Sequence, residues 1–357
     1  MAYAFAIDPA ELFVERTPQM LSTGIPRSDL DGVRTQIVDM WADAPGGWVF
    51  EWSRLARRYA ENGQPNLASV AFGWAKFPTC ATPAMRTALK NQLEQYLRAA
   101  PDFPVEFERR ILDLPHKGGR TPVPVHILSM QGLPADAPIL VVTGGVDTWK
   151  MDVHGRLVAL ALMGVARVLT FDIAGTGESQ VAMSPDGGAE IAEGVVAAAR
   201  AMGARKVAYF GISMGGYFAA RLGLSGLVDA TVDFGGPVGA KPRKGLPTSF
   251  GMFDIVSNAL GYDERPEPEE FMAQMAGFSL RALLDQDRNG PMLVVNGADD
   301  VHVPQEDTLA FEGRRDTTVH LIPETGHCAA TKSAEAFGII QTWLRDALAD
   351  QPSAARS

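Results

Sequence analysis

Apolar side chains in the first part of the chain recur at helical spacing. Between about residues 28 and 100 they return every three or four positions, as Leu89, Leu93 and Leu97 do, and capping or breaking residues interrupt the pattern. One face of each such segment is apolar, so the segments must pack against one another. The pattern predicts an N-terminal helical domain over residues 1–102.

After residue 102 the pattern changes to short, continuous apolar runs separated by segments with helical spacing. Two β-rich segments at 105–114 and 121–130, joined by a Gly/Pro-containing link, predict an opening hairpin. The apolar runs that follow are 138–143, 166–172, 206–211, 229–234, 291–297 and 318–323. Strands buried on both faces are continuously apolar, so the pattern predicts an α/β fold for 103–357, with a mostly parallel sheet and helices on both faces.

One interval breaks this alternation. Residues 236–289 contain a Pro/Gly/Lys-rich loop and then helical patterns at Phe250–Leu260 and Glu269–Leu284. An insertion of this size after a strand is typical of a lid over an active site. We expect the lid and the helical domain to cover the site together. Apolar side chains that we expect to line a pocket there are among Trp41, Trp48, Trp52, Met252, Phe253, Phe271, Met272 and Met275.

Composition excludes several classes of protein. The net charge of −10 argues against binding to a phosphate backbone, which requires a basic face. Cys80 and Cys328 lie far apart, without the spacing of a zinc site or a disulfide framework. The N-terminus has no basic region before an apolar run, and no stretch approaches the roughly 20 apolar residues of a membrane span. We expect a soluble, cytoplasmic protein without metal or cofactor that binds neither nucleic acid nor membrane.

The strongest local motif is Gly211–Gly215, with the sequence G-I-S-M-G. It follows the apolar strand 206–210 directly and precedes the helical segment 214–224. This strand–turn–helix setting predicts a nucleophile elbow, which lifts Ser213 above the sheet near a helix N-terminus. The base of such a site follows the last strand of the sheet, and we therefore expect His327 to accept the proton of Ser213.

The acid that orients the base should lie between nucleophile and base in the chain. Asp300 stands three residues after Gly297 and four before Pro304, which is the usual spacing of this acid. Its neighbour Asp299 is the alternative. His302 lies in the same loop, and we interpret it as a pocket or packing residue.

Two backbone N–H groups should bind the negative charge that develops during acyl transfer. The residue after the nucleophile, Met214, supplies one in such sites. The other should come from the Gly-rich loop at 144–147, where we expect Gly145 or Val146 to donate. A second Gly-rich stretch at 175–177 lacks the third glycine of a dinucleotide-binding loop, so it does not indicate a cofactor.

Several of these motifs together resemble one family of α/β hydrolases. It contains the fermentation–respiration switch protein, a pseudooxynicotine hydrolase and the fungal yellowish-green pigment hydrolase. The resemblance rests on five segments: GGVDTWK at 144–150, FDIAGTGES at 171–179, GISMGGY at 211–217, NGADDVHVP at 296–304 and ETGHC at 324–328.

This resemblance covers roughly residues 45–345, and the sequence differs from the family pattern at several positions. Val146 and Thr148 are mild changes, whereas Ile173 and Ala174 replace a Gly-Pro pair. It implies a triad of Ser213, Asp300 and His327, an active site between the core and the helical domain, and a homodimer. Members of the family differ in reaction, so the resemblance does not choose the substrate.

These observations predict a serine hydrolase for a mid-sized, apolar carbonyl compound of β-diketone or polyketide type, with cleavage of a carbon–carbon bond slightly favoured. A carboxylesterase or thioesterase, a lyase or cyclase on the same scaffold, and a regulatory binding protein are the alternatives. A second acid–base residue would assist a carbon leaving group, and Asp147, Asp233 and Glu178 are candidates for it. Candidate pocket residues are Tyr217, His302, Met252, Phe253 and Met272.

Overall fold

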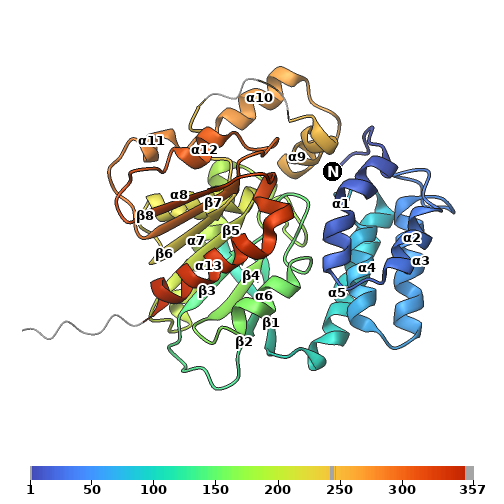
Figure 1. Ribbon diagram of the computed structural model, residues 1–357, viewed down its shortest axis with the longest axis horizontal. Coiled ribbons are helices and arrows are strands. Elements are labelled where there is room, and N and C mark those ends of the chain that lie inside the picture. Colours follow the sequence, from blue (N-terminus) through green and yellow to red (C-terminus); the bar gives the residue numbers. More distant parts are fainter. Residues whose placement is uncertain (1, 242–244, 246, 350–357) are drawn as a thin grey trace, which may run out of the picture.

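The computed structural model describes residues 2–241, 245 and 247–349. Its centre is an eight-stranded sheet with the strand order β1-β2-β4-β3-β5-β6-β7-β8 (Figure 1). The strands are β1 (Glu106–His116), β2 (Gly119–Ser129), β3 (Ile139–Thr143), β4 (Arg167–Phe171), β5 (Val207–Ile212), β6 (Ala230–Phe234), β7 (Met292–Gly297) and β8 (Thr317–Ile322). β1 and β2 form an antiparallel hairpin and β2 pairs antiparallel with β4, whereas the strands from β3 to β8 are mutually parallel. This confirms the predicted mostly parallel sheet.

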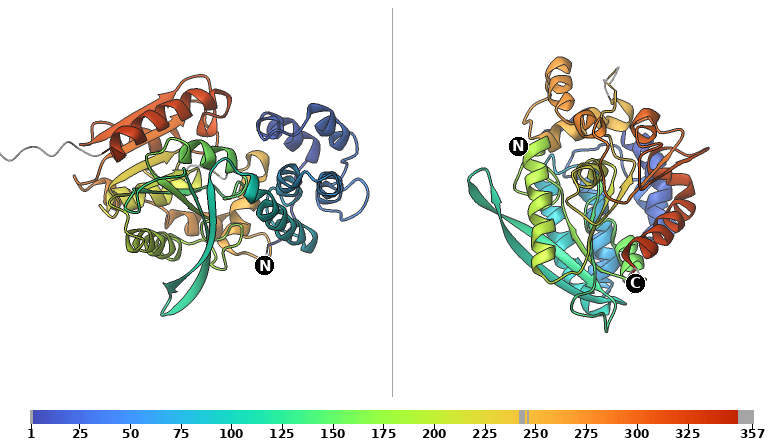
Figure 2. Two further views of the ribbon diagram at one scale, coloured as in Figure 1. Left: turned by 90° about the horizontal axis from the view of Figure 1, so that it is seen from below. Right: turned by 90° about the vertical axis from the view of Figure 1, so that its left-hand side faces the viewer.

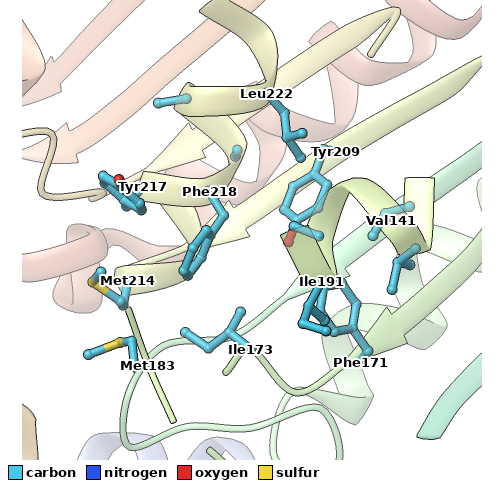
Figure 3. Packing of buried hydrophobic residues seen from close by; sticks show 14 of the residues in the cluster. Val141, Phe171, Ile173, Met183, Ile191, Tyr209, Met214, Tyr217, Phe218 and Leu222 are labelled. Carbon is cyan, nitrogen blue, oxygen red and sulfur yellow. The ribbon is translucent and has the colours of Figure 1, made fainter. Parts of the chain in front are cut away.

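Helices cover both faces of the sheet because its strands present apolar side chains on both. Successive residues of β3 divide between two hydrophobic clusters: Val141 belongs to one, and Leu140 and Val142 to the other. The first cluster is completed by α7 (Pro185–Ala201) and α8 (Met214–Leu224), as Figure 3 shows for part of it. The second is completed by α6 (His154–Ala161) and α13 (Ser333–Leu348). A short helix, α12 (Gln305–Leu309), precedes β8.

The N-terminal helices stand beside this core (Figure 2, left). They are α1 (Pro9–Ser22), α2 (Arg27–Arg34), α3 (Trp48–Glu61), α4 (Pro65–Ala75) and α5 (Pro83–Ala99), followed by the 3-10 turn η1 (Ala100–Asp102). They have a hydrophobic cluster of their own, in which Trp48 and Trp52 are fully buried. Burying a large apolar side chain stabilises a fold by about 1.5–3 kcal/mol. These two tryptophans, which are among the residues from which we expected pocket-lining side chains, hold the helices together.

Helix α1 differs from the sequence interpretation, which placed no helix before residue 28. Its start is well formed: Asp8 caps it by accepting hydrogen bonds from the N–H groups of Ala10 (2.7 Å) and Glu11 (3.3 Å), and Pro9 occupies the first helical position. Pro18 lies inside the helix and removes one backbone donor. This interior proline weakens the helical pattern in the sequence, and tertiary packing of Leu12, Phe13 and Met20 compensates for it.

The insertion between β6 and β7 contains the short turn η2 (Ser249–Gly251) and three helices, α9 (Met252–Leu260), α10 (Pro268–Ala276) and α11 (Arg281–Leu284). The single helix expected over Glu269–Leu284 is wrong, because the chain leaves it at Gly277 and the Leu280 N–H donates instead to the Val238 carbonyl (2.8 Å). Parts of the predicted Pro/Gly/Lys loop, at 242–244 and 246, and the predicted domain's end at 350–357 lie outside the described residues.

Two further searches concern the described part of the chain. None of its helices is long and apolar enough to cross a membrane. Within the same residues, no group of three or more His, Cys, Asp or Glu side chains is arranged to hold a metal ion.

Candidate active site

Ser213 occupies the turn between β5 and α8 in a strained backbone conformation. Its φ is 54° and its ψ is −124°, which side-chain-bearing residues rarely adopt and which costs about 1–3 kcal/mol. The flanking glycines permit the turn. A Cβ on Gly211 would lie 2.0 Å from the Gly215 carbonyl oxygen, and a Cβ on Gly215 would lie 2.5 Å from the Gly144 oxygen. The strained turn thus exposes the hydroxyl at the carboxyl ends of the strands.

A chain of hydrogen bonds connects Ser213 to two residues from distant loops. The His327 Nε2 lies 2.9 Å from the Ser213 Oγ, and its Nδ1 lies 2.7 Å from the Asp300 Oδ2. His327 follows β8 and Asp300 follows β7, so the parallel order of β5, β6, β7 and β8 brings the three loops to one edge of the sheet. In this arrangement the imidazole can accept the hydroxyl proton while the carboxylate holds the ring.

The carboxylate of Asp300 is held by four donors. Its Oδ1 accepts the backbone N–H groups of His302 (2.7 Å) and Val303 (3.1 Å), and its Oδ2 accepts the Asn296 side chain (2.8 Å) as well as His327. Asp299 instead is exposed, and its backbone N–H donates to the Thr325 carbonyl (2.9 Å). The structure therefore brings Asp300, and not Asp299, to the imidazole.

The pKa values of Asp300 and His327 are shifted in opposite directions. Burial acts to raise the pKa of Asp300, but its hydrogen bonds and the charge of His327 outweigh burial and lower the pKa below its ordinary value. Burial acts to lower the pKa of His327, but neighbouring Cys328 and the Asp300 carboxylate outweigh it, and the pKa lies above its ordinary value. The pair thus favours a negative carboxylate beside an imidazole that holds a proton readily.

The Gly-rich loop lies against the Ser213 turn. Gly145 lies against Ser213, since a Cβ on it would be 2.9 Å from the Ser213 Cβ. However, the Gly145 N–H donates to the Thr148 carbonyl (3.0 Å) within its own loop. Among the described residues, no acceptor bonds the N–H of Val146 or of Met214. The geometry therefore favours Val146 over Gly145 as the second donor beside Met214.

Comparisons with known proteins identify the fold. A family model described as "alpha/beta hydrolase fold" matches residues 137–226. The chain has the α/β-hydrolase fold. No curated protein is significantly similar to it in sequence.

Solved structures with this fold extend the likeness over the whole chain. A 2,6-dihydroxy-pseudo-oxynicotine hydrolase is 20% identical, with a TM-score of 0.73 over 93% of this chain and 95% of its own. Wild-type AbyA5 is 21% identical, with a TM-score of 0.75 over 96% of this chain and 99% of its own. An esterase from the archaeon Pyrobaculum calidifontis is 15% identical, with a TM-score of 0.51 over 73% of this chain and 92% of its own.

Buried ion pairs support the Gly-rich loop of this α/β-hydrolase fold. Lys150, which ends the GGVDTWK segment, is fully buried and pairs with Asp172 and with Glu178 (2.8 Å). Glu178 also accepts two hydrogen bonds from Arg109 (2.7 and 2.9 Å), which with Lys150 overcome burial and lower its pKa to about 2. Glu178, a candidate auxiliary acid, is therefore committed to a structural network that joins two of the resemblance motifs.

Asp233 and Tyr217, two other candidates, lie inside the fold. Asp233 in β6 accepts the Gly236 N–H (2.8 Å), and burial raises its pKa to about 8. Tyr217 is fully buried in α8, where it lies beside Phe218 (Figure 3). Its ring packs edge-on against those of Phe218 and Phe278. The structure thus places Tyr217 in a packed aromatic group, and its role in a substrate pocket stays a prediction.

The insertion approaches the site through aromatic contacts. The His302 ring lies 5.4 Å from the His327 ring, and the Phe250 ring lies 6.5 Å from that of His302. This contact places His302 beside the base. Phe253 is buried in the core cluster, and Met252 and Met272 are half-buried against the same cluster. Their expected place in a pocket stays a prediction.

Helix α1 contributes residues that the sequence interpretation missed. Arg16 donates to the Asp147 carboxylate (2.7 Å) and lies 2.6 Å from the Glu15 carboxylate. Asp147 follows Val146 directly, so this contact ties the N-terminal helices to the Gly-rich loop. Burial raises the pKa of Glu15, which Arg16 opposes. No spacing rule connects α1 to a loop about 130 residues away, and only the Asp8–Pro9 cap indicated a helix here.

Proposed function

We propose that this protein is a serine hydrolase. The observation that carries the proposal is the continuous hydrogen-bonded chain from Ser213 through His327 to Asp300, built on the strained turn. His327 takes the proton of the Ser213 hydroxyl as its oxygen bonds to a substrate carbonyl carbon. Asp300 fixes the ring so that Nε2 faces the serine, and it stabilises the imidazolium that forms.

The N–H groups of Met214 and Val146 then bind the former carbonyl oxygen as it becomes negative. Met214 begins α8, whose N-terminus favours negative charge. Removing one such donor in comparable sites costs about 10²–10³-fold in turnover. The leaving group takes the proton from His327, and water attacks the acyl-serine by the same route in reverse.

The substrate in this proposal is a mid-sized, mainly apolar carbonyl compound of β-diketone or polyketide type. The likeness to the pseudo-oxynicotine hydrolase and to AbyA5 includes the N-terminal helices, whereas the esterase covers 73% of the chain. This difference supports a substrate bound between those helices and the core. Cleavage of a carbon–carbon bond is our first assignment.

A carboxylesterase or thioesterase is the second candidate, and a specific observation favours it. His327 alone can protonate an oxygen or sulfur leaving group, whereas a carbon leaving group gains from a second acid. Of the three acids expected for that role, Glu178 is committed to Arg109 and Lys150, Asp233 accepts the Gly236 N–H inside the core, and Asp147 pairs with Arg16.

The test is labelling with a fluorophosphonate, followed by turnover of matched substrates. We expect the wild-type protein to be labelled at Ser213 and Ser213→Ala to remain unlabelled. Turnover of simple acyl esters far faster than of any β-diketone would replace the carbon–carbon assignment with the esterase. Reaction in ¹⁸O-water distinguishes hydrolysis, which places ¹⁸O in the acid product, from a lyase or cyclase reaction, which does not.

Absence of labelling at Ser213 in correctly folded protein would overturn the hydrolase proposal and favour a regulatory binding protein. The homodimer implied by the family resemblance stays a prediction. Sedimentation velocity tests it.

A further inference from the structure

A cavity of about 510 Å³ lies at the boundary between the N-terminal helices and the core. We call it the boundary cavity. Its apolar wall includes Val70, Trp74, Phe77, Met151 and Phe337, and its polar lining includes Gln19, Asn66, Asp152, His154 and Arg156. This volume suits a small organic molecule, since ligand pockets measure about 300–1,000 Å³. The mixed lining fits a ligand with an apolar body and one polar end.

The carboxylates that line the boundary cavity already have cationic partners. Asp147 pairs with Arg16 (2.7 Å). Asp152 pairs with buried Lys76 and accepts the Gln92 side-chain amide (2.8 Å). These carboxylates are therefore neutralised by the N-terminal helices.

Arg156 in α6 differs from them. Its side chain is half-buried and lines the cavity, yet within the described part of the chain no carboxylate or carbonyl bonds its guanidinium. Burial lowers the pKa of Arg156, and part of the side chain stays open to the cavity. By contrast, the guanidinium of half-buried Arg314 donates to the carbonyl oxygens of Leu284 and Gln286 (both 2.6 Å). A half-buried guanidinium that lines a cavity and has no carboxylate or carbonyl partner among the described residues is available to an anion that comes with a ligand.

The surroundings add no competing charge. His154 contacts the Tyr96 hydroxyl through Nδ1 (2.9 Å), and burial lowers its pKa to about 4, so the ring is neutral at neutral pH. The first turn of the sixteen-residue helix α13 lines the cavity with Ser333 and Ala334. Its N-terminus carries partial positive charge and adds to the attraction of Arg156 for an anion.

The boundary cavity also adjoins the loops of the candidate active site. Thr148 lines it, and the Thr148 carbonyl binds the Gly145 N–H beside Ser213. Ser333 lines it and directly follows the turn η3 (His327–Lys332), which begins at the base. A molecule in the cavity would therefore touch the loop that includes Val146 and the residue that follows the η3 turn, although Ser213 and His327 do not themselves line the cavity.

We propose that the boundary cavity binds the carboxylate end of an organic acid with an apolar body, and that Arg156 pairs with that carboxylate. A guanidinium can hold a carboxylate with two parallel hydrogen bonds, which gives both charge and orientation. We further assign this acid as the substrate itself, an assignment that rests on the hydrolase proposal. Its carboxylate is then the end of the molecule distant from the cleaved bond.

The first experiment measures binding without turnover. Full-length wild-type protein is titrated with 4-phenylbutyrate and with its neutral amide, by calorimetry and by tryptophan fluorescence, since Trp74 lines the cavity. We expect the acid to bind at least about tenfold tighter than the amide, and Arg156→Gln to remove that preference. Arg156→Lys, which keeps the charge, should retain part of it.

Arg34→Gln is the matched control, because it removes one exposed positive charge from α2 and should change the affinity less than twofold. Thermal melting verifies that each variant folds. Equal affinity of wild-type and Arg156→Gln protein for 4-phenylbutyrate, or equal affinity of the wild type for acid and amide, would overturn the proposal.

The second experiment determines whether the acid is the substrate. 4-Nitrophenyl butyrate is compared with 4-nitrophenyl hemiesters of longer dicarboxylic acids. Arg156→Gln should raise the KM of the hemiesters by a factor at least about tenfold larger than the change in the KM of the neutral ester. Unchanged hemiester kinetics beside lost 4-phenylbutyrate binding would overturn the substrate assignment. Failure of fluorophosphonate labelling would overturn the hydrolase proposal alone, since binding is measured without turnover.

Discussion

The candidate active site and the boundary cavity differ in whether their charged side chains have partners. Around Ser213, the carboxylate of Asp300 has four donors and the imidazole of His327 has a partner on each nitrogen. In the boundary cavity, half-buried Arg156 has no partner among the residues that the structure describes. The charged groups around Ser213 are thus paired without a ligand, whereas a ligand could supply the partner that Arg156 lacks.

This difference shows how the chain divides chemistry from recognition. Reacting groups benefit from being fixed before the substrate arrives, because no reorganisation is then needed in the transition state. A recognition group benefits from being unpaired, because a ligand that lacks the matching charge leaves it unsatisfied. We therefore expect substitutions in the candidate active site to reduce turnover, and substitutions in the boundary cavity to alter which substrates bind.

The largest effect should come from the nucleophile. We expect Ser213→Ala to lower kcat by about 10⁶-fold on the best substrate found, because triad members act as a unit. Circular dichroism and melting should be unchanged, since the alanine only removes a hydroxyl. Turnover within tenfold of the wild type would place the chemistry elsewhere.

The adjacent carboxylates provide the next comparison. Asp300→Asn should lower kcat by about 10⁴-fold, because an amide at this position favours the wrong tautomer of His327. Asp299→Asn is the matched control, since Asp299 is exposed, and should change kcat less than about threefold. The reverse order in a side-by-side kinetic measurement would exchange the two assignments.

The contact between α1 and the Gly-rich loop should have a smaller effect. Arg16→Gln frees Asp147 and loosens the neighbouring Val146 N–H, so we expect kcat to fall about 10- to 100-fold with little change in KM. Arg27→Gln, which breaks only an exposed ion pair with Asp31, serves as the control. A rise in KM with unchanged kcat would show that Arg16 acts in binding rather than in positioning the loop.

The smallest expected effect is that of pH on kcat/KM, which should change about tenfold per pH unit below the pKa of the base. The pKa of His327 lies above its ordinary value of 6.5, and only the neutral ring can accept the serine proton. The specificity constant kcat/KM should therefore rise with pH until His327 has lost its proton, at a pKa above 6.5, and then level off. A plateau that already begins below pH 6 would contradict the raised pKa.

Much of the fold was predictable because it depends on local pattern. The apolar run at 206–211 became β5, the following helical segment became α8, and the hairpin at 105–130 became β1 and β2. The helix expected over Glu269–Leu284 failed at Gly277, where the Val238 carbonyl offers the Leu280 N–H another partner. Helix α1 was missed because Pro18 disturbs its pattern and distant packing stabilises it.

The sequence by itself determined the strand–turn–helix around Ser213 and the chain order of Asp300 and His327, since both follow from spacing that parallel strands impose. The catalytic roles of these residues stay predictions until the variants are measured. Only the tertiary structure decided that Arg16 reaches Asp147. Among the residues it describes, it also decided that the N–H of Gly145 has an acceptor and that of Val146 has none, and that Arg156 faces a cavity without a partner. These features depend on contacts between segments far apart in the chain, and the distance between such segments is set by packing rather than by local pattern.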